Sequence, residues 1–348
     1  MKINKNGKKK NKFRKFLSIL GPGLITGAAD DDPSGIATYS QTGAQFGFGQ
    51  LWTAVWMLPF MMGVQEASAR IGLVTGKGIA AVVREKYNKK MLYTMVAIVL
   101  IANTINIGAD IGAMAAAANL IIPLHFSAWT LLFTASILIL EIFTSYRVYA
   151  RILKWLALSL LAYPLTILII DMPWAEVIMA TFIPHFEFSF AFLFIITGVL
   201  GTTISPYMFF WEASQEVEEL KEKNIFQNGN YRARKPMVKR MRIDINAGML
   251  ISEITTWSIM VVAGAVLHKG GVQDIGTAAD AAKALEPLVS SFPNAGFLAK
   301  LIFAIGIIGL GFFAVPVLSA SAAYAVSEAV NWDSGLSLKL KKAHGFYG

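Results

Sequence analysis

Three adjacent aspartates lie where the sequence otherwise has the apolar character of a membrane-spanning segment. Residues 30–35 read DDDPSG, inside a run from Leu17 to Gln65 that has no other charged residue. Ionisable residues within a membrane usually face a bundle interior or an aqueous path, and unwound backbone survives there only where it lines a cavity. The segment therefore predicts a cation site with Asp32 as its main ligand. Asp30 and Asp31 precede the break, where they would line the access path or face a water-filled vestibule.

Two interrupted helices are expected to position these carboxylates. Pro33 lacks a backbone donor and Gly35 tolerates unusual dihedrals, so the first span should consist of two half-helices. A similar break is expected at residues 201–207 (GTTISPY), where Pro206 follows hydroxyl residues in an apolar background. Alone, Pro206 could mark a simple kink. Two interrupted helices five spans apart, however, indicate an inverted-repeat transporter with its ion site near the bilayer midplane.

The composition is that of an integral membrane protein rather than a soluble domain. Of 348 residues, 55% are hydrophobic and only 15% are charged, against about 25% in ordinary soluble domains. Cysteine is absent from the sequence, which excludes disulfides and thiolate metal ligands. The sequence has no nucleophile–histidine pairing, phosphate loop or zinc signature, so we expect neither an enzyme nor a bound cofactor. The net charge of +9 comes largely from loops and indicates topology and lipid contact, not nucleic-acid binding.

Eight apolar runs approach the roughly 20 residues needed to cross a bilayer. They lie near residues 17–46, 50–72, 92–118, 127–146, 151–171, 188–219, 243–267 and 296–330. Alternate loops are basic, so the positive-inside rule places both termini in the cytosol, and the short arms favour a bacterial inner membrane. We predict a basic cytosolic arm at 1–16, a transmembrane domain at 17–331 and a cytosolic tail at 332–348. Residues 272–291 are expected to form a short helix on the outer surface.

The chain resembles the NRAMP family of divalent-metal transporters, whose fold is an all-α, LeuT-like inverted repeat with discontinuous first and sixth helices. The resemblance is carried by GPGLITGAADDDPSGIATYSQTGAQFGFGQLW at 21–52 and QEASARIGLVTGKG at 65–78. It extends to NIGADIGAMAAAANLI at 106–121 and GTTISPYMFFWEAS at 201–214. It implies a transporter that moves divalent cations by alternating access, with a first repeat at 17–171 and a partial second repeat at 188–331.

The positions that match the family's metal ligands differ in chemistry. The family motif Asp-Pro-Gly-Asn binds metal through its Asp and Asn; Asp32 matches, but Ser34 and Gly35 replace the last two residues. In the sixth helix, the family's alanine carbonyl and methionine thioether fall on Thr202 and Ser205. The resemblance thus implies a metal site at Asp32, Gly35, Thr202 and Ser205 that has lost its soft ligand.

A roomier site lined by oxygens favours hard ions. Thioethers select softer transition metals, whereas hydroxyl, carbonyl, carboxylate and water oxygens suit Mg²⁺ and Mn²⁺. Mg²⁺ is usually held by one or two carboxylates and keeps several waters, which fits a site with one strong carboxylate. The NRAMP-related magnesium transporters lack the same ligands, and the sequence is most similar to that branch. We therefore predict transport of Mg²⁺, with Mn²⁺ also accepted.

Proton coupling is not expected from the residues present. The family's two histidines correspond to Tyr207 and Glu212, and all four histidines of this chain lie in loops or near span ends. Histidine is the side chain whose ordinary pKa permits proton exchange near neutrality. Uptake driven by the membrane potential is the simpler prediction, although a buried Glu212 could still carry a proton. Asp110 shares a helix face with Asn103 and Asn106, where it lines the aqueous path or bonds neighbouring helices.

Other functions stay open at this point. A proton-coupled Mn²⁺ or Fe²⁺ symporter is one, and a LeuT-like amino-acid or Na⁺ carrier is another, although three aspartates would repel its substrate carboxylate. An intramembrane aspartyl enzyme would need Asp110 or Asp244 to face Asp32, and a non-transporting sensor or scaffold is also consistent. A complete transporter of this type would need at least two more spans. The last spans therefore look absent, which predicts either a fragment or a chain that completes its wall by oligomerising.

Overall fold

The first predicted interruption is present and has a local cause. In the computed structural model, which describes residues 22–143, 161–222, 233–338 and 340–348, α2 (Pro22–Asp30) stops before α3 (Pro33–Phe46) starts. Asp32 is the N-cap of α3: its backbone is extended, and its carboxylate accepts a hydrogen bond from the Gly35 amide at 2.6 Å. Aspartate is a preferred N-cap, and proline suits the first helical position. The DDDPSG segment thus breaks the span by starting a new helix.

The second predicted interruption is also present, between α11 (Phe190–Thr203) and α12 (Pro206–Glu222). Proline has no N–H to offer, so a carbonyl in the preceding turn needs another donor. The hydroxyl of Ser205 takes this role, because its oxygen lies 2.9 Å from the carbonyl oxygen of Gly201 and 2.6 Å from that of Thr202. Both discontinuous helices of the prediction are therefore found.

The remaining described elements are also helical. In chain order they are α4 (Trp52–Thr75), α5 (Ile79–Lys86), α6 (Lys89–Asn119), α7 (Phe126–Phe143), α9 (Ala162–Ile167), α10 (Trp174–Phe182), α13 (Lys235–Ala263), the π-helix η2 (Gly264–His268), α14 (Ala278–Ala282), the 3₁₀ helix η3 (Lys283–Val289), α15 (Ala295–Val330), the 3₁₀ helix η4 (Leu340–Lys342) and α16 (His344–Tyr347). No strand occurs in the part of the chain that the structure describes.

The prediction of eight spans is not confirmed. Among the described residues, five helical segments are long and apolar enough to cross a membrane: α6, α7, the α11–α12 pair, α13 with η2, and α15. The first predicted span is divided into two shorter helices, and α4 carries polar residues such as Gln65 and Glu66 that lower its hydropathy. The predicted arm at 1–16 lies outside the described residues, as do residues 17–21 of the first span, 144–146 of the fourth, 151–160 of the fifth and the loop residues 223–232.

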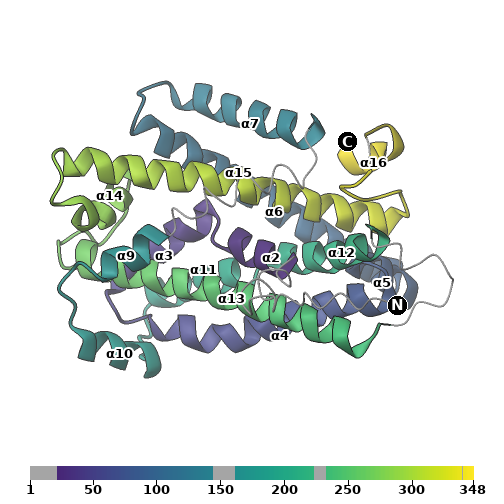
Figure 1. Ribbon diagram of the computed structural model, residues 1–348, viewed down its shortest axis with the longest axis horizontal. Coiled ribbons are helices and arrows are strands. Elements are labelled where there is room, and N and C mark those ends of the chain that lie inside the picture. Colours follow the sequence, from purple (N-terminus) through teal and green to yellow (C-terminus); the bar gives the residue numbers. More distant parts are fainter. Residues whose placement is uncertain (1–21, 144–160, 223–232, 339) are drawn as a thin grey trace, which may run out of the picture.

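The first interruption lies in the middle of the helix bundle. The long helices α4, α13 and α15 run along the longest axis of the molecule, and α2 and α3 lie between them (Figure 1). Helix α2 packs against α13 and also contacts α12 and α15, while α3 contacts α13, α11 and α6. The aspartates at the junction of α2 and α3 therefore lie among several helices of the bundle. An intramembrane ion site usually has such a position.

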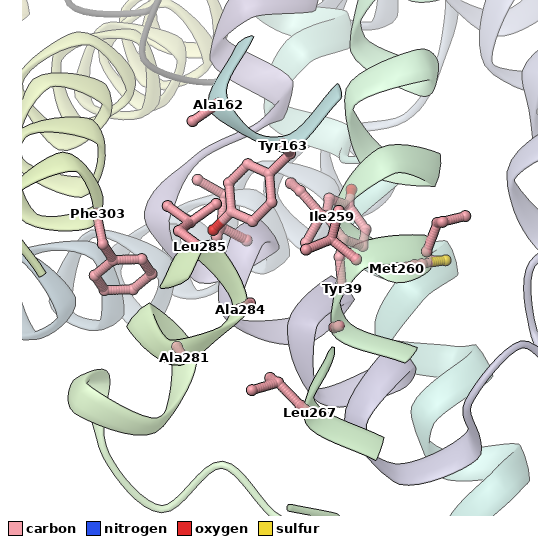
Figure 2. Packing of buried hydrophobic residues seen from close by; sticks show 14 of the residues in the cluster. Tyr39, Ala162, Tyr163, Ile259, Met260, Leu267, Ala281, Ala284, Leu285 and Phe303 are labelled. Carbon is pink, nitrogen blue, oxygen red and sulfur yellow. The ribbon is translucent and has the colours of Figure 1, made fainter. Parts of the chain in front are cut away.

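The largest apolar cluster joins α3 and α13 to the segment that was expected to form a surface helix. Tyr39 and Ile259 meet Tyr163 of α9 and Leu285 of η3 in this cluster (Figure 2). The expectation of a short surface helix at 272–291 is therefore only partly correct. Two short helices, α14 and η3, occupy this range, and Leu285 is 1% exposed. The segment packs into the core through its apolar residues Ala281, Ala284, Leu285 and Val289.

The predicted tail at 332–348 packs back onto the bundle in the described residues. Phe346 of α16 is buried, and its ring centroid lies 4.9 Å from that of Tyr324 on α15. The hydroxyl of Tyr324 donates to Glu218 of α12, whose carboxylate also accepts the amide of Leu336 at 2.7 Å. The placement of both termini in the cytosol stays a prediction.

Candidate cation site

Asp32 is the centre of a buried network of oxygen and nitrogen atoms. Asp32 is only 1% exposed to solvent. One carboxylate oxygen accepts the Gly35 amide and the Ser34 hydroxyl, at 2.6 and 2.7 Å. The other accepts the amide group of Asn106 at 2.8 Å and, more weakly, the hydroxyl of Tyr207 at 3.4 Å. Helices α3, α6 and α12 thus all contribute to the surroundings of one carboxylate.

Ser34 links Asp32 to a second carboxylate on α6. Its backbone amide donates to Asp110 at 3.0 Å, and its hydroxyl lies 2.8 Å from the side-chain oxygen of Asn106. A hydroxyl carries a single hydrogen, so Ser34 can donate either to Asp32 or to Asn106 at one time. The second carboxylate oxygen of Asp110 is buried and has no hydrogen-bond partner among the described residues. This network has spare acceptor capacity for a cation.

Of the two predicted ligands on the sixth span, Thr202 lies close to Asp32, whereas Ser205 is engaged by backbone carbonyls. A Cβ atom built on Gly35 would lie 3.0 Å from the hydroxyl oxygen of Thr202 and 3.2 Å from a carboxylate oxygen of Asp32. These three residues are therefore neighbours, as expected. Ser205 instead directs its hydroxyl hydrogen to the carbonyls at the end of α11, including that of Thr202. Its lone pairs, rather than its proton, are what it could offer to a cation.

The three aspartates do not act as one group. Asp30 and Asp31 turn toward α13, where Ser252 donates to Asp30 at 2.7 Å and Thr256 donates to Asp31 at 3.2 Å. Both aspartates are buried in the bundle, so neither faces a solvent-exposed vestibule in this conformation. Sequence reasoning missed the two hydroxyl residues, although their spacing of four on an apolar helix places them on one face.

The remaining predicted pathway residues lie at different places. Tyr207 reaches Asp32 and the carbonyl of Ala29, the latter at 3.3 Å. Glu212 lies further along α12, where the hydroxyl of Thr26 on α2 donates to it. The structure therefore associates Tyr207, but not Glu212, with Asp32.

The side chains around Asp32 offer few direct ligands to a metal ion. Within residues 22–143, 161–222, 233–338 and 340–348, no three Asp, Glu or His side chains are arranged to hold one metal ion together. The available ligands near Asp32 are one or two carboxylates, an amide and hydroxyls. Mg²⁺ is typically bound by such sets, with water completing an octahedron.

Comparison with known proteins finds one matching family model and several similar transporters. Residues 23–347 match the family model described as "Natural resistance-associated macrophage protein-like", Nramp. The divalent metal cation transporter MntH of Caldanaerobacter subterraneus subsp. tengcongensis is 27% identical over 288 residues, which are 82% of this chain and 66% of that protein. The protein of the same name from Chromohalobacter salexigens is 26% identical over 278 residues, 79% of this chain and 63% of that one.

A solved structure shares the fold. The crystal structure of the Eremococcus coleocola manganese transporter, in complex with an aromatic bis-isothiourea substituted compound, matches with a TM-score of 0.75 and 16% sequence identity. The match covers 97% of this chain and 70% of the other. This chain spans roughly two thirds of the length of the curated relatives named above. The match to the family model extends over nearly all of the sequence, and the chain therefore belongs to the Nramp family.

Proposed function

We propose that this protein transports divalent metal cations across a cell membrane by alternating access, with Mg²⁺ preferred and Mn²⁺ accepted. The observation that carries the proposal is the buried carboxylate of Asp32, located at a helix break and surrounded by hydroxyl and amide groups. Freed backbone and a carboxylate at such a break are the usual elements of an ion site in inverted-repeat transporters. The proposed ligands are Asp32, Gly35, Thr202 and Ser205.

The preference for hard ions rests on the chemistry of the donors. The hydrogen-bond partners of Asp32 among the described residues are Ser34, Gly35, Asn106 and Tyr207, which offer oxygen and nitrogen but no sulfur. Oxygen ligands suit Mg²⁺ and Mn²⁺, whereas thioethers favour softer metals. Asp30, Asp31, Asp110, Tyr207 and Glu212 are proposed to line the pathway.

We propose that uptake is driven by the membrane potential without an accompanying proton. Histidine is the usual proton carrier near neutral pH, and none of the four histidines is a hydrogen-bond partner of Asp32 among the described residues. Inward movement of two charges gains about 4.6 kcal/mol per 100 mV of membrane potential. This is enough to concentrate a divalent cation by more than three orders of magnitude per 100 mV.

Transport by the purified chain in liposomes tests the proposal. We expect Mg²⁺ and Mn²⁺ to enter when the interior is negative, with mutual competition and no acidification of the lumen. Protein-free liposomes carrying the same potential are the control. Absence of uptake above this control would refute transport, and proton entry in proportion to metal entry would refute the uncoupled mechanism.

Introducing a thioether should broaden the choice of ion. Ser205→Met places a soft ligand at the family's methionine position, and we expect Cd²⁺ uptake to rise at least about tenfold relative to Mg²⁺ uptake. Ser205→Ala is the matched control, because it also removes the hydroxyl but adds no sulfur. Equal Cd²⁺ uptake by the two variants would show that this position does not contact the ion.

A further inference from the structure

A second group of carboxylates lies on the side of the helix break opposite to Asn106 and Asp110. It consists of Asp30 and Asp31 at the end of α2 and Glu253 on α13. These residues are 0%, 1% and 4% exposed, so all three are buried. Glu253 lies on α13 next to Ser252, which donates to Asp30, and one turn before Thr256, which donates to Asp31. The group is part of the contact between α2 and α13, which lie side by side in the bundle (Figure 1).

The polar atoms of this group are only partly satisfied. Ser252 and Thr256 each donate one hydrogen bond, to Asp30 and Asp31 respectively. One carboxylate oxygen of Asp30 and both carboxylate oxygens of Glu253 are buried without a hydrogen-bond partner among the described residues. Buried polar atoms are nearly always paired, so three unpaired carboxylate oxygens at the contact between α2 and α13 indicate a missing ligand or ordered water.

A bound cation accounts for these atoms better than protonation does. Three buried carboxylates without a described basic partner would each cost several kcal/mol if left ionised. Protonation of Glu253 would remove its charge, but its carbonyl oxygen would still lack a donor, because neither oxygen of this side chain has a hydrogen-bond partner among the described residues. A hydrated cation supplies both positive charge and water donors, and so satisfies the carboxylates together.

We propose that Asp30, Asp31 and Glu253 form a second cation site, which takes a divalent ion that keeps part of its water. The site deepens the proposed transport function and rests on it. Three acidic side chains are not arranged here to hold a bare metal ion directly, so one or two carboxylates bind the ion and water completes its coordination, as is common for Mg²⁺. Because Asp30 and Asp32 are close in sequence, ions at the two sites repel each other, and each promotes release of the other.

The stoichiometry of Mn²⁺ binding tests the proposal. The full chain in detergent is titrated with Mn²⁺, and free Mn²⁺ is followed by its electron paramagnetic resonance signal. We expect two ions per chain in the wild type and one in Glu253→Gln, with at least an about tenfold loss of affinity at the missing site. Glu141→Gln is the matched control, since Glu141 is a partly buried glutamate on α7 that accepts a hydrogen bond from Ser319, and it should still bind two.

The variants separate failure of this inference from failure of the transport proposal. One ion in the wild type, or two in Glu253→Gln, would overturn the second site and leave the assignment of Asp32 intact. Asp32→Asn should lose the other ion, and its retention of both would count against the Asp32 site only. Glu253→Asp restores a carboxylate and should regain the second ion, which shows that a loss in Glu253→Gln is not misfolding; failure to regain it overturns the inference.

Discussion

Asp32→Asn is expected to abolish cation uptake while leaving the protein folded. Asparagine has the same shape and can still accept the Gly35 amide, and it is as good an N-cap as aspartate. The change removes the negative charge that a divalent cation needs, and it also replaces the oxygen that accepts from Asn106 with an amide group. Substitution of groups that merely orient metal ligands costs about 10–100-fold, so loss of the principal ligand should lower initial uptake of Mg²⁺ at least about 100-fold.

Asn106→Ala provides a graded comparison for this result. Asn106 donates to Asp32 at 2.8 Å and orients it, so we expect an intermediate loss of about tenfold in uptake. Uptake is measured in liposomes, and size-exclusion profiles report folding. If Asp32→Asn transported Mg²⁺ within about twofold of the wild type, Asp32 would not be the ligand. A greater loss in Asn106→Ala than in Asp32→Asn would instead assign the central role to Asn106.

The interrupted helices could be predicted because their causes are local. Asp32 and Pro33 form a helix N-terminus by themselves, and Pro206 cannot extend a helix that precedes it. These effects act over a few residues, so the helix ends that they cause can be recognised from the sequence. The family match agrees with the resemblance found at the same segments.

The division of the aspartate triplet could not be predicted in the same way. Whether Asp30 faces α13 or α6 depends on the rotation of α2 against its neighbours, and that rotation is set by tertiary packing. The same limit applies to η3, because Leu285 is buried where η3 packs against α9 and α15. Helix α9 is far from η3 in the sequence, so this contact cannot be recognised from local patterns.

One packing signal in the sequence was overlooked. Gly23 and Gly27 form a GxxxG pattern, which lets helix backbones approach closely in membranes. The structure places both glycines against the backbone of α13: a Cβ on Gly23 would lie 2.6 Å from the amide nitrogen of Ile245, and one on Gly27 would collide with the carbonyl of Gly248. The pattern therefore fixes the rotation of α2 and, with it, the direction of Asp30 and Asp31.

Gly27→Ala is consequently expected to destabilise the protein, although alanine normally favours a helix. The added methyl group would lie 2.8 Å from the Cα of Gly248 and still closer to its carbonyl, and a backbone cannot rotate away as a side chain can. Overpacking typically costs about 1–3 kcal/mol, and collision with backbone on a central helix should reach the upper end of that range. We expect a lower melting temperature in detergent and a large loss of monodisperse protein.

Gly63→Ala isolates the packing effect, because it makes the same chemical change in a helix without the collision. Gly63 is exposed on α4, and a Cβ there would meet nothing within 4 Å. Alanine should therefore be neutral or stabilise the protein by about 0.5–1 kcal/mol. Gly27→Ala should thus lower the melting temperature, whereas Gly63→Ala should leave it unchanged or raise it. If Gly27→Ala were as stable as Gly63→Ala, the close contact of α2 with α13 would be wrong, and so would the direction assigned to Asp30 and Asp31.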